Sequence, residues 1–150
     1  MRIAIGNDHV GYSLKQKMVS FLESQGHTVR DFGADGASQV DYPVYGQRVA
    51  QAVAGGSCDL GVLICGTGIG ISLAANKVPG IRAALCGDPY SASMARAHND
   101  ANIVAFGARV VGEGLAAEIV KAFLQTPFEG GRHLERVQMI DAIGRGECLG

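Results

Sequence analysis

Apolar residues fall into two alternating patterns along this chain: short continuous runs, and longer stretches in which they recur at helical spacing. The short runs, rich in Val, Ile and Leu, are typical of strands buried on both faces of a sheet. We expect strands at residues 2–6, 28–32, 60–65, 82–86 and 102–106. The helical spacing predicts helices at 13–25, 42–54, from about 71, 89–98 and 114–124. This alternation indicates a doubly wound α/β domain with a five-stranded parallel sheet covered on both faces.

A further amphipathic stretch follows this pattern, at about residues 132–144, with apolar side chains at Leu134, Val137, Ile140 and Ile143. The five-stranded pattern is complete before this stretch begins. We therefore expect an extra helix that covers a neighbouring subunit. The 150 residues suit a single domain with one core, with a polar loop at 33–41.

Charge and cysteine content exclude several classes of partner. The net charge is −1 and no basic stripe is present, which argues against binding to nucleic acid or to an anionic membrane. No apolar run reaches the roughly 18 residues that a membrane span needs, and the apolar run near Met1 is too short for a signal peptide. The four cysteines, Cys58, Cys65, Cys86 and Cys148, form no C-x-x-C pair. Free thiols in a cytoplasmic protein are expected, and two disulfides are the alternative.

The third predicted strand ends in a cysteine and a glycine-rich turn, Cys65-Gly66-Thr67-Gly68-Ile69-Gly70. The glycines let backbone N–H groups face the crevice at the strand end, and the helix that follows favours negative charge there. A thiolate base or nucleophile beside an anion hole is a catalytic arrangement. The alternatives are an inert core cysteine on a tight connection, or a nucleotide site with Asp88 as the ribose-binding acid, although the spacing is not G-x-G-x-x-G.

Further chemistry-bearing residues follow the other strands, at Asp8-His9, at Cys86-Gly87-Asp88 and, one helix later, at His98-Asn99-Asp100. Parallel strands bring their carboxyl ends to one edge, so we expect several of these groups around one crevice. The histidines are candidate proton shuttles, while Asp8 could equally cap the next helix. Asp88 would raise the pKa of the Cys86 thiol, which favours Cys65 as the reactive cysteine.

Three arginines are candidates for binding a phosphate group. Arg132 and Arg136 are four residues apart on the last predicted helix and share one face. Paired guanidinium groups bind phosphate through charge-assisted hydrogen bonds. A solvated helix face is the alternative interpretation of this pair. Arg109, after the fifth strand, is the third candidate.

Together these residues resemble the ribose-5-phosphate isomerase B family and its galactose-6-phosphate isomerase relatives. The resemblance spans residues 1 to about 140 and rests on eight ordered motifs: Asn7-Asp8-His9-Val10-Gly11, Asp41-Tyr42-Pro43, Cys65 to Gly70, Ala75-Asn76-Lys77, Ile81-Arg82-Ala83, His98 to Asn102, Gly107-Ala108-Arg109 and Gly130-Gly131-Arg132 with Arg136. It implies a Rossmann-like three-layer αβα fold that binds no nucleotide. It also implies an isomerase without metal or cofactor, which interconverts ribose 5-phosphate and ribulose 5-phosphate through a cis-enediol.

The resemblance also implies a role for each matched residue. Cys65 would be the base that moves the proton between C2 and C1, and Thr67 would assist transfer between the sugar oxygens. His98, with Asp8, would open the furanose ring. The amides of Gly66, Thr67, Gly68, Ile69 and Gly70 would hold the enediolate. Tyr42 and Asn99 would bind sugar hydroxyls, and the phosphate would be bound by His9, Arg109, Arg132 and Arg136.

One branch of the family carries a glutamate base just beyond this turn, where Ile71 stands here, so the cysteine branch fits. The family implies a homodimer or homotetramer whose sites are shared between subunits. The sequence leaves open whether the sugar is a pentose or a hexose phosphate, such as allose or galactose 6-phosphate. Different functions that it also leaves open are a nucleotide- or nicotinamide-binding protein, a regulatory domain that binds a sugar phosphate, and a thiol-redox enzyme.

Overall fold

The computed structural model describes residues 1–36 and 38–150. Residue 37, in the predicted polar loop, lies outside the described residues. All five predicted strands are present and form one parallel sheet: β1 (Arg2–Asn7), β2 (Thr28–Asp31), β3 (Leu60–Cys65), β4 (Ala83–Leu85) and β5 (Ile103–Gly107). Their order is β2-β1-β3-β5-β4, so β4 is an edge strand and β5 is inserted beside β3.

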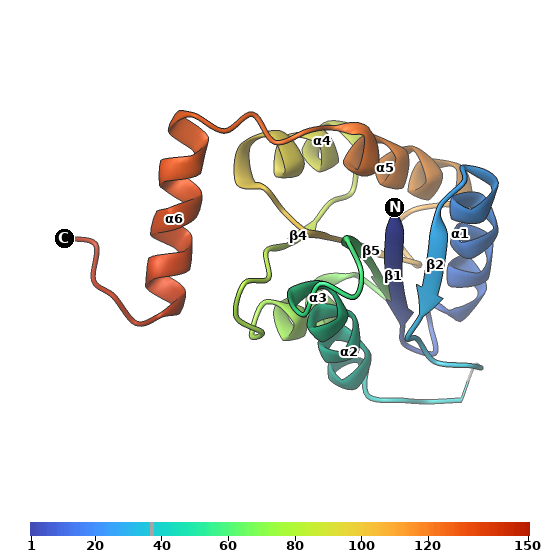
Figure 1. Ribbon diagram of the computed structural model, residues 1–150. Helices are drawn as coiled ribbons and strands as arrows, with labels where there is room; N and C mark the ends of the chain where they lie inside the picture. The colour runs from blue at the N-terminus through green and yellow to red at the C-terminus, as the bar shows by residue number, and fades with distance from the viewer. Residues whose placement is uncertain (37) are drawn as a thin grey trace.

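Helices cover both faces of this sheet, as the apolar strands require (Figure 1). On one face lie α1 (Tyr12–Ser24), α4 (Pro89–Asn99) and α5 (Glu113–Gln125). On the other lie α2 (Tyr42–Ala54) and α3 (Ile69–Ala75). The alternation along each strand divides the core: Val62 and Ile64 pack under the first group, Leu63 and Cys65 under the second. The three-layer α/β architecture is therefore confirmed.

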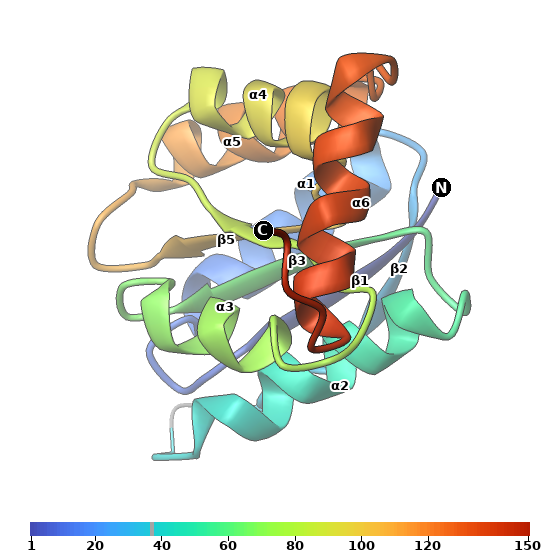
Figure 2. The ribbon, with the colours of Figure 1, turned by 90° about the vertical axis from the view of Figure 1, so that its left-hand side faces the viewer.

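The predicted C-terminal helix is also present, as α6 (Arg132–Gly144). It packs mainly against α4 and stands outside the β4 edge of the sheet, with no strand beneath it (Figures 1 and 2). Val137 and Ala142 are buried, whereas Leu134, Ile140 and Ile143 remain 45–58% exposed. The apolar stripe is thus only partly covered within one chain. No helix in residues 1–36 or 38–150 is long and apolar enough to span a membrane.

Predicted boundaries agree with the structure to within two residues. The largest difference is at α3, which begins at Ile69 where the sequence predicts a start near Ile71. The cause is Gly68, which has a left-handed conformation (φ +81°) and caps the helix. A Cβ at this glycine would lie 2.7 Å from the backbone of Phe106, so the turn also requires a residue without a side chain.

Candidate functional site

Cys65 lies where β3 ends, buried beneath the glycine-rich turn. Its Sγ accepts a hydrogen bond from the Gly68 N–H, at 3.1 Å. The Ile69 N–H donates to Thr67 Oγ1, at 3.2 Å. Two of the turn amides expected to hold an oxyanion therefore have partners inside the turn. The Gly68 amide donates to the sulfur itself. A hydrogen bond of this kind stabilises a thiolate.

Asp8 and His9 follow β1, the strand beside β3. The strand order reverses between these two strands, which is where open α/β sheets bind ligands. The Asp8 N–H donates to the Ile64 carbonyl at 3.2 Å, which brings the aspartate next to Cys65 in the sheet. Asp8 is buried, and its Oδ1 accepts from the amides of Val10 and Gly11. These bonds close the turn that leads into α1, whose N-cap is Gly11, so Asp8 does not cap that helix as the alternative interpretation suggested, and Oδ2 is left for a ligand.

Three more predicted residues lie at this edge. His9 is half-buried, and its Nδ1 accepts from the Val40 N–H at 3.4 Å, so Nε2 carries the proton of the neutral ring. The Tyr42 ring lies against Gly70, where a Cβ would come within 2.7 Å of it. The Arg109 N–H donates to the Gly66 carbonyl at 3.1 Å, and its Nη1 lies 3.9 Å from where a Gly66 Cβ would be. We call Asp8, His9, Tyr42, residues 65–70 and Arg109 the Cys65 edge.

Cys86, another buried cysteine, is placed differently. Cys86 packs into the core on the opposite face of the sheet from Cys65. Burial and the nearby Asp88 carboxylate raise the pKa of Cys86 to about 11, so this thiol stays protonated at neutral pH. Asp88 itself caps α4, where its side chain accepts from the Ser91 N–H. This contact accounts for Asp88 without a ribose ligand. All four cysteines are free thiols.

His98 and Asn99 do not join the Cys65 edge within one chain, which corrects the expectation of a single crevice. They lie in the last turn of α4, which runs back across the sheet. After this helix, the Asn102 N–H donates to the Arg82 carbonyl, at the start of β4. Cys65 instead pairs with Gly107, at the far end of β5. The length of β5, about 13 Å at ~3.3 Å per residue, separates the two positions.

His98 instead stacks on His133, the second residue of α6. Their ring centroids are 4.3 Å apart and the planes differ by 5°. Glu129 Oε2 lies 3.8 Å from His98 Nε2 and 3.4 Å from His133 Nε2. Burial and then His98, Arg132 and Arg136 lower the pKa of His133, against an opposing effect of Glu129. We call His98, Glu129 and His133 the His98 cluster; Arg132 and Arg136 stand exposed beside it.

Sequence spacing missed this cluster, because Glu129 and His133 meet His98 only through the packing of α6 on α4. Its three ligand-type side chains have donor atoms within 4.8 Å of one another, as a metal site would require. However, the two rings are parallel, so their nitrogen lone pairs do not converge on one point. The observed geometry is that of a stacked pair beside a carboxylate, and a cation would require one ring to turn.

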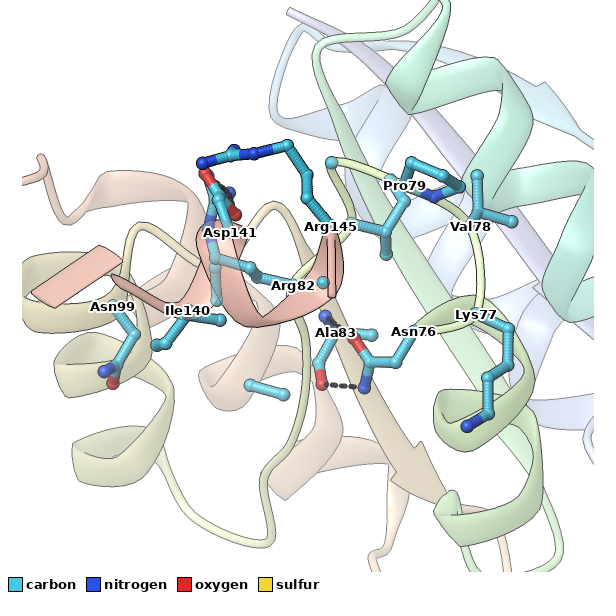
Figure 3. Close-up of a pocket in the computed structure, with 15 residues that line it drawn as sticks. Asn76, Lys77, Val78, Pro79, Arg82, Ala83, Asn99, Ile140, Asp141 and Arg145 are labelled. Atoms are coloured by element: carbon cyan, nitrogen blue, oxygen red, sulfur yellow. Dashed lines mark hydrogen bonds and ion pairs between the residues drawn. The ribbon is translucent and has the colours of Figure 1, made fainter. Parts of the chain in front are cut away.

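A cavity of about 710 Å³ opens between α6 and the loop before β4 (Figure 3). Lys77, Ile140 and Asn99 are among its lining residues. Arg82 holds one wall by pairing with Asp100 and with Asp141 of α6, each at 3.1 Å. The side chain of Asn76 exchanges two hydrogen bonds with the backbone of Ala83. The motifs at residues 75–77 and 81–83 therefore shape this loop and fix α6. Both motifs lie away from the Cys65 edge.

Comparisons with known proteins show the family to which the chain belongs. Ribose-5-phosphate isomerase B of Escherichia coli K12 is 55% identical over 142 residues, which cover 95% of each chain. Galactose-6-phosphate isomerase subunit LacB of Clostridium acetobutylicum is 45% identical, over 86% of this chain and 75% of that one. The solved ribose-5-phosphate isomerase B of Clostridium thermocellum superposes with a TM-score of 0.96 at 55% identity, covering 97% of this chain and 99% of that one. Residues 3–140 match the family described as Ribose/Galactose Isomerase, and the chain belongs to that family.

Proposed function

We propose that this protein is an aldose–ketose isomerase that interconverts ribose 5-phosphate and ribulose 5-phosphate. The observation that carries the proposal is the thiol of Cys65, held by the Gly68 amide at the carboxyl end of β3, beside β1, where the strand order reverses. The Asp8 carboxylate and the Arg109 guanidinium lie at the same edge. Isomerisation needs a base for a carbon acid, donors for a developing oxyanion and a cation for the phosphate, and these residues supply each.

The reaction begins with the cyclic sugar. Asp8 takes the proton of the anomeric hydroxyl, an imidazolium at His98 gives a proton to the ring oxygen, and the bond between C1 and that oxygen breaks. This leaves an open-chain aldehyde at C1. His9, Arg109, Arg132 and Arg136 hold the phosphate, while Tyr42 and Asn99 hold sugar hydroxyls.

Proton transfer between the carbons follows. The Cys65 thiolate removes the proton at C2, and the electron pair moves to the C1 carbonyl to give a cis-enediolate. Amides of the turn at 66–70 stabilise the negative oxygen. Thr67 assists proton transfer between O1 and O2, and the Cys65 thiol returns its proton to C1. The product is the ketose, and no net proton or electron is gained or lost.

A complete site in this mechanism needs two copies of the chain. His98, Asn99, Arg132 and Arg136 lie at the opposite end of the sheet from Cys65. A homodimer that brings the His98 cluster of one copy to the Cys65 edge of the other would complete the site. The half-covered stripe of α6 and the cavity beside it support such an association. A homotetramer would repeat this contact.

The proposed activity is tested by turnover of a panel of aldose phosphates. Ribose 5-phosphate should give the highest kcat/KM, with allose 6-phosphate and galactose 6-phosphate as competitors. The relationship to a galactose-6-phosphate isomerase subunit is the specific reason to test hexoses. A higher kcat/KM for a hexose phosphate would reassign the substrate and keep the chemistry. Absence of turnover on the whole panel would reject the isomerase proposal.

A further inference from the structure

The His98 cluster contains two side chains, His133 and Glu129, to which the mechanism above gives no role. We propose that both are positioning residues for His98: the buried ring of His133 fixes the plane of the His98 ring, and the Glu129 carboxylate pairs with its Nε2. This inference rests on the proposed function, in which His98 opens the sugar ring. It adds an explanation of how the half-exposed His98 ring is held in one orientation.

The first support is the difference in burial between the two rings. The His133 side chain is 11% exposed, whereas the His98 side chain is 40% exposed at the end of α4. A half-exposed side chain in a last helical turn has several rotamers, so its ring needs an outside contact to hold one orientation. The stack on His133 provides that contact, with centroids 4.3 Å apart and planes within 5°.

The second support is electrostatic. The Glu129 carboxylate lies at the Nε2 atoms of both rings. The lowered pKa of His133 keeps its ring neutral near neutral pH, so it does not repel a charged neighbour. Glu129 therefore pairs with the ring that donates a proton to the sugar in the proposed mechanism.

Other charged groups lie around the cluster, on α6 and on α4. On α6, Arg132 and Arg136 oppose a positive charge, and Glu129 is the carboxylate that offsets them. On α4, Arg96 pairs with Asp100 at 2.7 Å. From α5, the ring of Phe123 faces Arg96. Glu129 is thus the anion next to His98, and its segment is tied to α4 by its N–H, which donates to the Ala97 carbonyl at 3.0 Å.

Two assays on the purified full chain separate positioning of His98 from general damage. Turnover of ribose 5-phosphate requires ring opening. Exchange of the C1 proton of ribulose 5-phosphate in D₂O does not, because this ketose is open-chain. We expect His133→Ala to lower kcat/KM for ribose 5-phosphate by about 10- to 100-fold while leaving proton exchange within about twofold of the parent. His133→Phe keeps a flat ring and should stay close to the parent in both assays.

Glu129→Gln tests the charge without disturbing the fold, since this side chain is 57% exposed. It should lower kcat/KM for ribose 5-phosphate and leave proton exchange within about twofold of the parent. Glu135→Gln, on an exposed position of α6, is the matched control. Equal losses in both assays for His133→Ala, or no loss in either, would overturn the positioning role. A parental kcat/KM in Glu129→Gln would overturn the role of the carboxylate.

An NMR measurement keeps this inference separate from the isomerase proposal. In protein labelled with ¹⁵N-histidine, the ring signals of His98 should shift in His133→Ala and in Glu129→Gln, and should not shift in Glu135→Gln. This readout needs no substrate. Turnover missing in the parent would reject the proposed function, whereas unmoved His98 signals in both variants would reject the positioning.

Discussion

At the scale of single residues, the decisive contact is the hydrogen bond from the Gly68 amide to Cys65 Sγ. It distinguishes Cys65 from Cys86, which has a similar place at a strand end but lies on the other face of the sheet. Cys86 has a raised pKa near a carboxylate. The same amino acid is thus a candidate base at one strand end and an inert core thiol at the next.

Cys65→Ala should remove most turnover of ribose 5-phosphate and leave the fold intact. Loss of a positioned base costs about 10² to 10⁴ in rate. The measurement is kcat, with a thermal melt to confirm folding. Cys86→Ala is the matched control, with little change in kcat expected. A Cys65→Ala variant that retains parental kcat would contradict the assignment of the base.

Alkylation offers a second residue-scale test. Cys148 is exposed and should react with iodoacetamide at once, whereas Cys86 should stay unmodified at pH 8 because its pKa is about 11. In a Cys148→Ser background, modification of Cys65 should inactivate the protein, and ribose 5-phosphate should slow it. Peptide mass spectrometry identifies the modified thiol. If the protein is inactivated while Cys65 stays unmodified, the loss of activity has another cause and does not identify Cys65 as the base.

At the scale of elements, α6 carries two of the candidate phosphate ligands and one residue of the His98 cluster. It carries Arg132 and Arg136 on an exposed face and buries His133 against α4. Arg82 fixes its far end through Asp141. The helix therefore brings two cations and His133 to the end of α4 that carries His98, at a distance from the thiol of its own chain.

Arg136→Ala should raise KM for ribose 5-phosphate by about tenfold or more. A charge-assisted contact to phosphate contributes roughly 1.5–3 kcal/mol. Some loss should appear in kcat, because phosphate binding also orients the reacting carbons. Steady-state kinetics measure both parameters, with Arg145→Ala on the same segment as the control. Parental KM in Arg136→Ala would end its assignment to the phosphate.

The lowered pKa of His133 predicts an acid sensitivity of the α6 contact. The unfolded chain binds a proton at this histidine below about pH 6.5, where the folded protein does not yet do so. Stability should therefore fall as pH is lowered through that value. The melting temperature of the parent should drop more between pH 7.5 and 5.5 than that of His133→Phe. Identical pH dependence in the two proteins would show that His133 makes no such contribution.

At the scale of the whole molecule, the separation of His98 from Cys65 is the reason to expect that two copies of the chain form one site. Mixing Cys65→Ala with Arg136→Ala protein tests it directly. If the two residues meet across subunits, a mixed dimer of two inactive or weakened chains contains one site with both residues intact. Random pairing of equal amounts makes about half of the dimers mixed, and each mixed dimer has one intact site of two. Activity should then rise toward about a quarter of the parental value after subunit exchange. No rise despite demonstrated exchange would place both residues in one chain.

Much of the architecture was determined by sequence alone, because the signals are local. Continuous apolar runs predicted strands buried on both faces, and helical spacing predicted the helices between them. The turn after Cys65 was predicted from its glycines, and Gly68 has the left-handed conformation that such a turn uses. Motif order indicated the family, which the comparisons confirm.

Tertiary structure decided which of these residues meet. His98 and Asn99 lie in the last turn of a helix that ends at the opposite end of the sheet, and Asp100 follows it, so the rule for strand ends does not apply to them. The pairing of His98 with His133 and Glu129 depends on how α6 docks on α4, for which the sequence carries no short-range pattern. Distances between elements far apart in sequence are set by strand order and helix packing, and these exist only in the folded chain.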